Sequence, residues 1–202
     1  MKTLSIVLIT ILLAGCSNLL TSKQNVNQFY TLNAATQFPE AVFDINETIV
    51  VNASTASAGL NTDRIILRTS AQRFDYYAGA RWNAMLPALV EQNVIQSMEN
   101  SRNLARVASS KSGVSADYVL MLDIRDFQAE YADPKQAPEV FVRLVGKLIA
   151  YPGRELAATF SVQVRQPAQQ NNLADVMVAF DQAFTQAQEL LVYEMLDYFV
   201  EF

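Results

Sequence analysis

Three carboxylates cluster in the segment 117–131, which the sequence predicts to be one long β-strand: Asp123, Asp126 and Glu130. A pair of neighbouring carboxylates is one arrangement used for general acid–base catalysis, so this cluster is the first candidate for chemistry. Side chains alternate between the two faces of a strand, which places Asp126 and Glu130 on one face and Asp123 on the other unless a bulge intervenes. Solvent-facing strand charges are the more common explanation of such a pattern.

The residues and motifs that the sequence lacks argue against catalysis. The chain contains no histidine, which excludes Ser-His triads, the commonest zinc ligand and the usual general base near neutral pH. It also contains no glycine-rich phosphate-binding loop and no Gly-x-Ser-x-Gly nucleophile elbow. We therefore expect a protein that is not an enzyme, with no cofactor and no metal site.

The only cysteine, Cys16, stands at the end of an N-terminal secretion signal. Lys2 supplies the basic n-region, and the segment 4–13 is apolar except for Ser5 and Thr10. This apolar run is too short for a membrane-spanning helix, which needs roughly 20 residues. The pattern predicts a signal peptide over residues 1–15, cleaved between Gly15 and Cys16.

The sequence Leu-Ala-Gly-Cys that ends this signal resembles the bacterial lipobox. The resemblance implies that a diacylglycerol is attached to Cys16 by a thioether, that cleavage precedes it, and that the new amine is acylated. More than one acyl chain is needed for stable anchoring, and this modification provides it. Ser17 in place of Asp resembles outer-membrane lipoproteins of enterobacteria, although the sorting rule varies and leaves the inner membrane open. The alternative is an ordinary signal peptide with an incidental cysteine.

The mature chain is expected to be one periplasmic domain on a tether. The formal net charge of −5 becomes −6 when Lys2 is removed, which argues against nucleic acid or an anionic lipid surface as a general partner. Residues 16–28 are mostly polar and are predicted to be the tether, and residues 29–202 are long enough for one domain with its own core. Acylation of Cys16 leaves no free thiol, so no disulfide is expected.

Periodicity predicts an α+β fold, an antiparallel sheet with two helices packed on one face. Strands are predicted at 29–32, 47–53, 64–69, 73–77, 104–108, 117–131, 140–151 and 155–165, and helices at 83–100 and 173–202. The last three strands are expected to form an antiparallel meander, because Pro152-Gly153 separates two alternating runs. In the strand 155–165, Leu156 and the following apolar alternate positions are expected to point inward.

Two local features of this fold are predicted in more detail. The apolar positions of strand 117–131 change parity between Ile124 and Phe127, which indicates a bulge near Arg125–Asp126 or a change of the buried face. Asn83 is the expected N-cap of the first helix, since Pro87 is tolerated only in its first turn. The preceding hairpin is expected to end at Gly79.

Arginines and aromatic residues gather between this hairpin and the first helix: Arg73, Tyr76, Tyr77, Arg81 and Trp82. These residue types dominate the binding energy of many protein interfaces, so the group is a candidate partner-binding site. The alternative is that the same side chains pack the corner between strand and helix. The sequence does not decide between the two.

Several motifs in a fixed order indicate a family. After the lipobox come Phe29–Leu32, Tyr77-Ala78-Gly79-Ala80-Arg81-Trp82, Leu86-Pro87, Asp117–Leu120, Asp126-Phe127 and Val178–Ala183. This series resembles the ABC-type transport auxiliary lipoproteins, the PqiC-like group. The resemblance covers nearly the whole mature chain, although no single motif is chemically unique.

The resemblance implies a lipid-anchored accessory of a system that contains a Mce-domain protein and inner-membrane transport components. Such systems move phospholipids or other hydrophobic molecules between the inner and outer membranes. The lipoprotein would dock the transport partner at the outer membrane, singly or as a homo-oligomer, with the corner at Trp82 as part of the contact. The alternatives are a stand-alone lipoprotein that binds lipid in an apolar pocket and one that assists outer-membrane or cell-wall assembly.

Overall fold

The computed structural model describes residues 27–38, 43–70 and 72–201. The predicted signal peptide, its cleavage site at Gly15, the lipidation site Cys16 and nearly all of the tether lie outside these residues. Within the described part, no helix is both long enough and apolar enough to cross a membrane.

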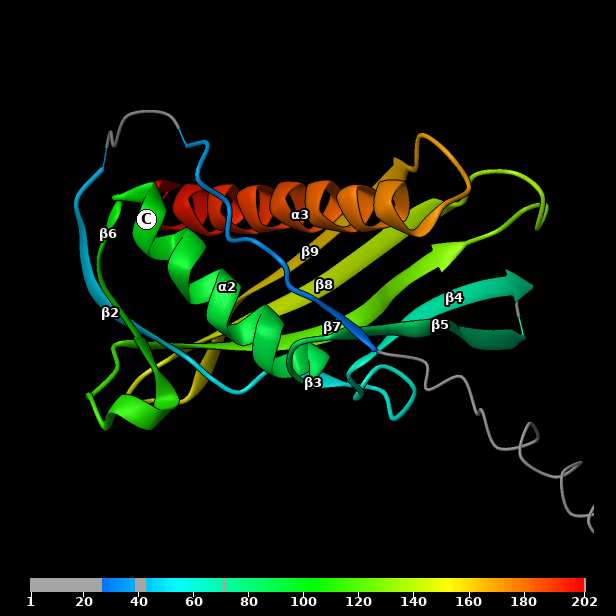
Figure 1. Cartoon of the computed structure of the whole chain (residues 1–202). Helices are drawn as coiled ribbons and strands as arrows, with labels where there is room; N and C mark the ends of the chain where they lie inside the picture. The colour runs from blue at the N-terminus through cyan, green and yellow to red at the C-terminus, as the bar shows by residue number, and fades with distance from the viewer. Residues whose placement is uncertain (1–26, 39–42, 71, 202) are drawn as a thin grey trace, which may run out of the picture.

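The described residues form one nine-stranded sheet and two long helices (Figure 1). In chain order the elements are β1 (Gln28–Tyr30), β2 (Ile45–Val51), β3 (Thr55–Ala56), β4 (Arg64–Ser70), β5 (Arg73–Trp82), α2 (Leu86–Ser101), β6 (Leu104–Ser109), a 3₁₀ turn (Ser110–Ser112), β7 (Tyr118–Glu130), β8 (Glu139–Ala150), β9 (Glu155–Pro167) and α3 (Leu173–Glu201).

The sheet is mixed rather than purely antiparallel, so that part of the prediction is wrong. Strands β7, β8 and β9 form the expected antiparallel meander. Along its other edge, however, β7 pairs in parallel with β2, β3 and β4 in turn. Long connections that contain α2 and the β4–β5 hairpin separate β2 from β7, and such crossovers allow parallel pairing. Accordingly Ile49, Val50 and Val51 are all buried, as in a strand covered on both faces.

The predicted bulge in β7 is confirmed. Ile124 lies opposite Leu144 and Asp126 opposite Arg143, so Arg125 is the extra residue. Because the bulge absorbs the change of parity, Leu120, Leu122 and Ile124 before it and Phe127 and Ala129 after it point to the same face of the sheet and are buried.

A second bulge, in β9, was not predicted. Leu148 pairs with Ala158 and Ile149 with Leu156, which leaves Ala157 as the extra residue. Leu156 was expected to point inward but is 59% exposed, because this bulge moves it to the opposite face.

Both helices lie on the same side of the sheet (Figure 1). Helix α3 packs along β8 and β9, and α2 contacts β6 and crosses α3. Between the helices and the sheet, the rings of Trp82, Phe127 and Phe180 stack or meet edge to face, with centroids 5.4–6.1 Å apart. Gly146 of β8 allows close packing here, since a Cβ atom at this position would lie 3.2 Å from Leu191 of α3.

The strand-to-helix corner departs from the prediction in two ways. Gly79 does not end β5; it takes a positive φ of 71° inside this strand, which continues to Trp82. Helix α2 begins at Leu86 with Met85 as its N-cap, not Asn83. Asn83 lies before the helix, where its backbone N–H donates a hydrogen bond to the carbonyl of Tyr30 in β1.

Residues 31–38, which we call the strap, cross both helices (Figure 1). The backbone N–H of Ala35 donates to Ser97 Oγ of α2 at 2.8 Å, and Ser97 Oγ donates to Gln188 Oε1 of α3 at 2.6 Å. The Gln188 amide in turn donates to the carbonyl of Asn33 at 3.0 Å. One buried polar chain therefore ties the strap to the crossing of the two helices.

Candidate functional site

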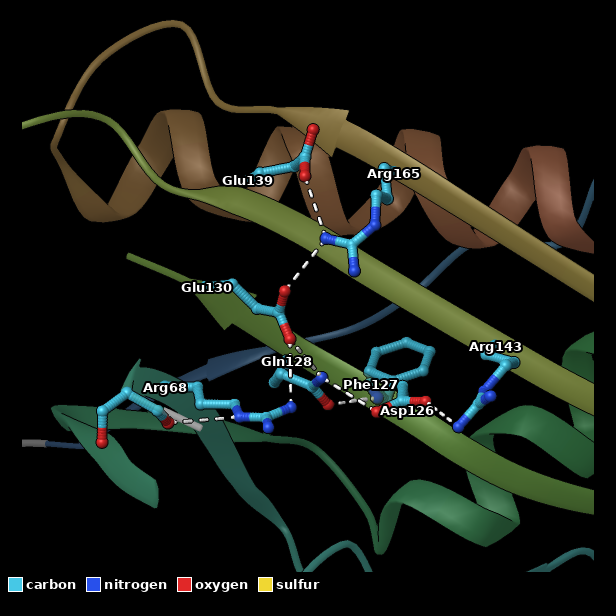
Figure 2. A network of polar contacts seen from close by, with 9 residues as sticks. Arg68, Asp126, Phe127, Gln128, Glu130, Glu139, Arg143 and Arg165 are labelled. Carbon is cyan, nitrogen blue, oxygen red and sulfur yellow. Dashed lines mark hydrogen bonds and ion pairs between the residues drawn. The ribbon is translucent and has the colours of Figure 1, made fainter. Parts of the chain in front are cut away.

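The face of the sheet turned away from the helices carries a row of charges (Figure 2). Strand register places Phe74, Arg68, Glu130 and Glu139 side by side on β5, β4, β7 and β8. Register partners share a face of the sheet, so these side chains form one row across four strands. We call this face, which is not covered by helices, the open face.

Glu130 is the centre of the polar network in Figure 2. Arg165 Nη1 lies 2.9 Å from Glu130 and 3.0 Å from Glu139, and so bridges the two carboxylates. On its other oxygen, Glu130 accepts from Arg68 Nη1 at 3.2 Å and from Gln128 Nε2 at 3.0 Å. Both oxygens of Glu130 are therefore occupied.

These contacts determine the ionisation states of Glu130 and Arg165. Burial disfavours the charged form of Glu130. The hydrogen bonds from Gln128 and Arg165 and the charges of the nearby arginines favour the charged form, and their combined effect is larger. The pKa of Glu130 consequently lies below its usual range. The hydrogen bond to Glu130 is the main reason that the pKa of Arg165 lies above its usual range. The pair is therefore ionised at neutral pH, and Glu130 is not poised to donate a proton.

An open groove of about 640 Å³ follows the same residues. We call it the charged groove and define it by Arg68, Asp126, Glu130, Glu139, Phe141, Arg143 and Arg165. The guanidinium of Arg165 lies 3.9 Å above the ring of Phe141, a cation–π contact. In the groove, the guanidinium of Arg165 is therefore held in a fixed orientation over Phe141. Carboxylates balance the charges of Arg165 and Arg143.

The three carboxylates considered for catalysis all lie on the open face, because the β7 bulge brings Asp123 to the side of the others. Each is nevertheless held by arginine rather than by another carboxylate. Asp123 pairs with Arg125 at 2.6 Å, and Asp126 pairs with Arg143 at 2.7 Å. No acid–base pair forms among these three residues, and the arrangement fits ionic contacts instead.

Trp82, one of the residues expected at a partner site, belongs to the core. Its side chain is 2% exposed and meets the rings of Phe127 and Phe180 edge to face. The corner-packing alternative describes this position, and Trp82 presents no surface to a partner in this structure.

Two further residues of the expected site are engaged within the fold. The hydroxyl of Tyr77 lies 2.8 Å from that of Tyr131, and burial raises the pKa of Tyr77. Arg81 Nη1 contacts both carboxylate oxygens of Asp63, at 2.8 and 2.9 Å. Both side chains help to shape the corner.

Arg73 and Tyr76 are the two expected site residues that remain accessible, and contact with a partner stays a prediction for them. Sequence reasoning missed three neighbours along the same hairpin: Phe74 on β5, Arg64 on β4 and Phe29 on β1. Phe74 and Tyr76 point to the open face, Phe29 pairs with the end of β5, and Arg73 extends from the hairpin tip on the side of Asp75. We call these five residues, which are spread along β5, the aromatic–arginine patch. Phe29 is 66%, Phe74 55% and Tyr76 38% exposed. Arg64 lies 4.7 Å above the ring of Tyr76. The alternation of Phe74 with Tyr76 in a strand was the signal that both share a face.

Solved structures of other proteins share this fold. Protein XCC0632 from Xanthomonas campestris is 25% identical, with a TM-score of 0.79 over 86% of this chain and 97% of its own. An uncharacterized protein at 11% identity shares the fold alone, with a TM-score of 0.65 over 84% of this chain and 99% of its own. Among curated proteins, none matches this sequence.

The sequence model of one family matches residues 30–191, which include strands β2–β9, helix α2 and most of α3. This match bears out the resemblance that the ordered motifs indicated. The chain therefore belongs to the family of ABC-type transport auxiliary lipoprotein components.

Proposed function

We propose that this protein is an outer-membrane lipoprotein that docks a Mce-domain protein of an ABC-type transport system through its charged groove. Family membership over residues 30–191 is the observation that carries the proposal. The anchor would be Cys16, and the cargo would be phospholipid or another hydrophobic molecule. The lipoprotein itself would neither pump nor catalyse.

The charged groove has the chemistry of a protein contact. Arginine and aromatic side chains are enriched among the residues that contribute most to interfaces. In the groove, Arg165 is already held between Glu130 and Glu139 and over Phe141, so little side-chain entropy remains to be lost on binding. An open groove lined by several charged side chains also fits a protein surface better than an acyl chain.

The alternative of a lipid-carrying lipoprotein needs an apolar cavity between the sheet and the helices. The rings of Trp82, Phe127 and Phe180 occupy that layer and contact one another, which counts against this alternative. The alternative of an assembly lipoprotein without lipid cargo predicts a different set of partners, and the next experiment separates it from docking.

Affinity purification of the tagged full-length protein from detergent-solubilised envelopes, followed by mass spectrometry, tests the docking proposal. We expect a Mce-domain protein to be recovered with the wild type and strongly reduced with Arg143→Ala and with Arg165→Ala. Arg106→Ala is the matched control, because Arg106 is an exposed arginine on β6, away from the groove, whose guanidinium bonds the backbone carbonyl of Asn46. Recovery of no transport component by an abundant, folded wild type would refute docking.

Mass spectrometry of the N-terminal peptide tests the anchor separately. We expect Cys16 to carry the diacylglyceryl and N-acyl groups and to be the first residue. Cys16→Ala should prevent cleavage and acylation. Ser17→Asp should move the protein from the outer to the inner membrane fraction if the enterobacterial sorting rule applies, and an unchanged distribution would contradict that assignment.

A further inference from the structure

The aromatic–arginine patch lies where the expected tether joins the sheet. Asn27, the first described residue, lines a shallow cavity of about 160 Å³ together with Arg64, Tyr76 and Arg81. The following strand, β1, pairs with the end of β5 and places Phe29 beside Arg81. The chain that connects Cys16 to the domain therefore arrives at the patch.

The charge of this region is opposite to that of the whole chain. Strands β4 and β5 contain four arginines and one aspartate, whereas the chain has a formal net charge of −5. Asp63 and Glu130 balance Arg81 and Arg68, so the local positive charge rests on Arg64 and Arg73. Within the patch, Arg73 makes only a long contact of 3.9 Å to Asp75, and its side chain is 72% exposed. The overall negative charge disfavours an anionic surface as a general partner. At the aromatic–arginine patch the exposed charges are positive, so contact with an anionic surface is not disfavoured there.

We propose that the aromatic–arginine patch rests on the surface of the membrane that holds Cys16. Phe29, Phe74 and Tyr76 would lie at the level of the lipid headgroups, where amphipathic aromatic side chains are favoured. Arg64 and Arg73 would meet lipid phosphates, which guanidinium groups bind well. This inference rests on the lipid anchor of the proposed function.

A short tether makes such a contact effective even when the patch alone binds weakly. Residues 16–28 span at most roughly 40 Å when extended, so the patch stays close to the bilayer. Linkers of this kind give effective concentrations on the order of millimolar, which lets a weak surface contact set the orientation of the domain.

This orientation leaves the charged groove accessible. Neighbouring strands of a sheet are rotated by roughly 20–25° relative to each other, and β4, β7 and β8 separate β5 from β9. A typical twist over these four steps is expected to turn the open face by about a right angle. The groove begins beside the patch, where the Arg68 guanidinium lies over the ring of Phe74, and would turn away from the membrane toward Arg165.

The test uses the full-length lipidated protein in vesicles of phosphatidylethanolamine and phosphatidylglycerol. Because Cys16 is the only cysteine and is acylated, one introduced cysteine accepts a fluorophore selectively. The label is placed by Tyr76→Cys or, as the control, by Val178→Cys on the exposed side of α3. We expect quenching by headgroup-labelled lipid to be several-fold stronger at position 76 than at position 178. Equal quenching at the two positions would overturn the inference.

Charge variants sharpen the test. In the Tyr76→Cys protein, the pair Arg64→Gln and Arg73→Gln should reduce quenching toward the level at position 178, whereas Arg106→Gln should leave it unchanged. Quenching that appears only after a protein partner is added would assign the patch to that partner and overturn the membrane contact. A domain that does not float with vesicles has lost the anchor of the proposed function, whereas a floating domain with equal quenching refutes only this inference.

Discussion

The two faces of the sheet differ in what holds their side chains. On the helix-covered face, the residues of β7 such as Phe127 pack against rings from α3 and exclude water. Gln128 and Glu130 of the same strand point to the open face. There Glu130 accepts a hydrogen bond from the Gln128 amide and forms an ion pair with Arg165. One strand therefore contributes to stability through its apolar side and to contact chemistry through its polar side.

The open face is itself divided. In the charged groove, Arg165 and Arg143 are balanced by carboxylates within 3.0 Å. In the aromatic–arginine patch, Arg64 lies over the ring of Tyr76 on the open face, and Arg73 extends into solvent from the tip of the hairpin. Balanced, oriented charges suit a protein surface that complements them, and cations among exposed rings suit a lipid headgroup layer.

The largest effect is expected on the helix-covered face. Phe180→Ala removes a ring that stacks on Phe127 and meets Trp82 edge to face, and should lower the free energy of unfolding by about 3–5 kcal/mol. Chemical denaturation followed by circular dichroism measures this loss. A loss below about 1 kcal/mol would show that the core can collapse around the cavity.

A smaller loss is expected where the strap meets the helices. Gln188→Ala leaves Ser97 Oγ and the carbonyl of Asn33 without this partner and should cost about 1–3 kcal/mol. Hydrogen exchange should show faster exchange in the strap than in the β7–β9 meander. Uniform acceleration over the whole chain would contradict a local tie.

A change at the centre of the charged groove should have a modest, pH-dependent effect. Glu130→Gln keeps the shape but removes the charge that Arg68 and Arg165 contact, and should cost about 1 kcal/mol at neutral pH. Because the folded-state pKa of Glu130 is lowered from 4.5, its stabilisation is present above pH 4.5 and is lost as the pH falls through the folded value. The free energy of unfolding of the variant should therefore vary less with pH below 4.5.

The smallest effect on stability is expected in the aromatic–arginine patch. Phe74→Ser removes a ring that is 55% exposed, and the free energy of unfolding should change by no more than about 0.5 kcal/mol. The same denaturation measurement applies. A loss comparable with that of Phe180→Ala would mean that the patch belongs to the core and would remove the contrast between the faces.

The features that local patterns encode were predictable from the sequence. The alternating runs on either side of Pro152-Gly153 predict β8 and β9, and both are present. The change of parity after Ile124 predicts the bulge, which is found at Arg125. Each of these signals depends on neighbours within a few residues.

Features that depend on distant partners were not predictable in the same way. Nothing near Ile49–Val51 specifies that β2 pairs in parallel with β7, although three successive apolar residues were a signal of burial on both faces. Trp82 was grouped with surface residues because its ring partners in α3 lie about one hundred residues later. In the charged groove, Arg68 lies beside Glu130 because β4 pairs with β7, and no local pattern in either strand indicates that pairing.

The strap gives the domain a defined path for mechanical load. Tension on the proposed lipid anchor would enter the described structure at Asn27 and meet first the three-residue pairing of β1 with β5. Next come the bonds of residues 31–38 to Ser97 and Gln188. The meander that carries the groove is not on this path. We therefore expect the N-terminal segment to unfold first under force. A partner docked as proposed would then stay bound to the folded meander while the proposed link to the membrane lengthens.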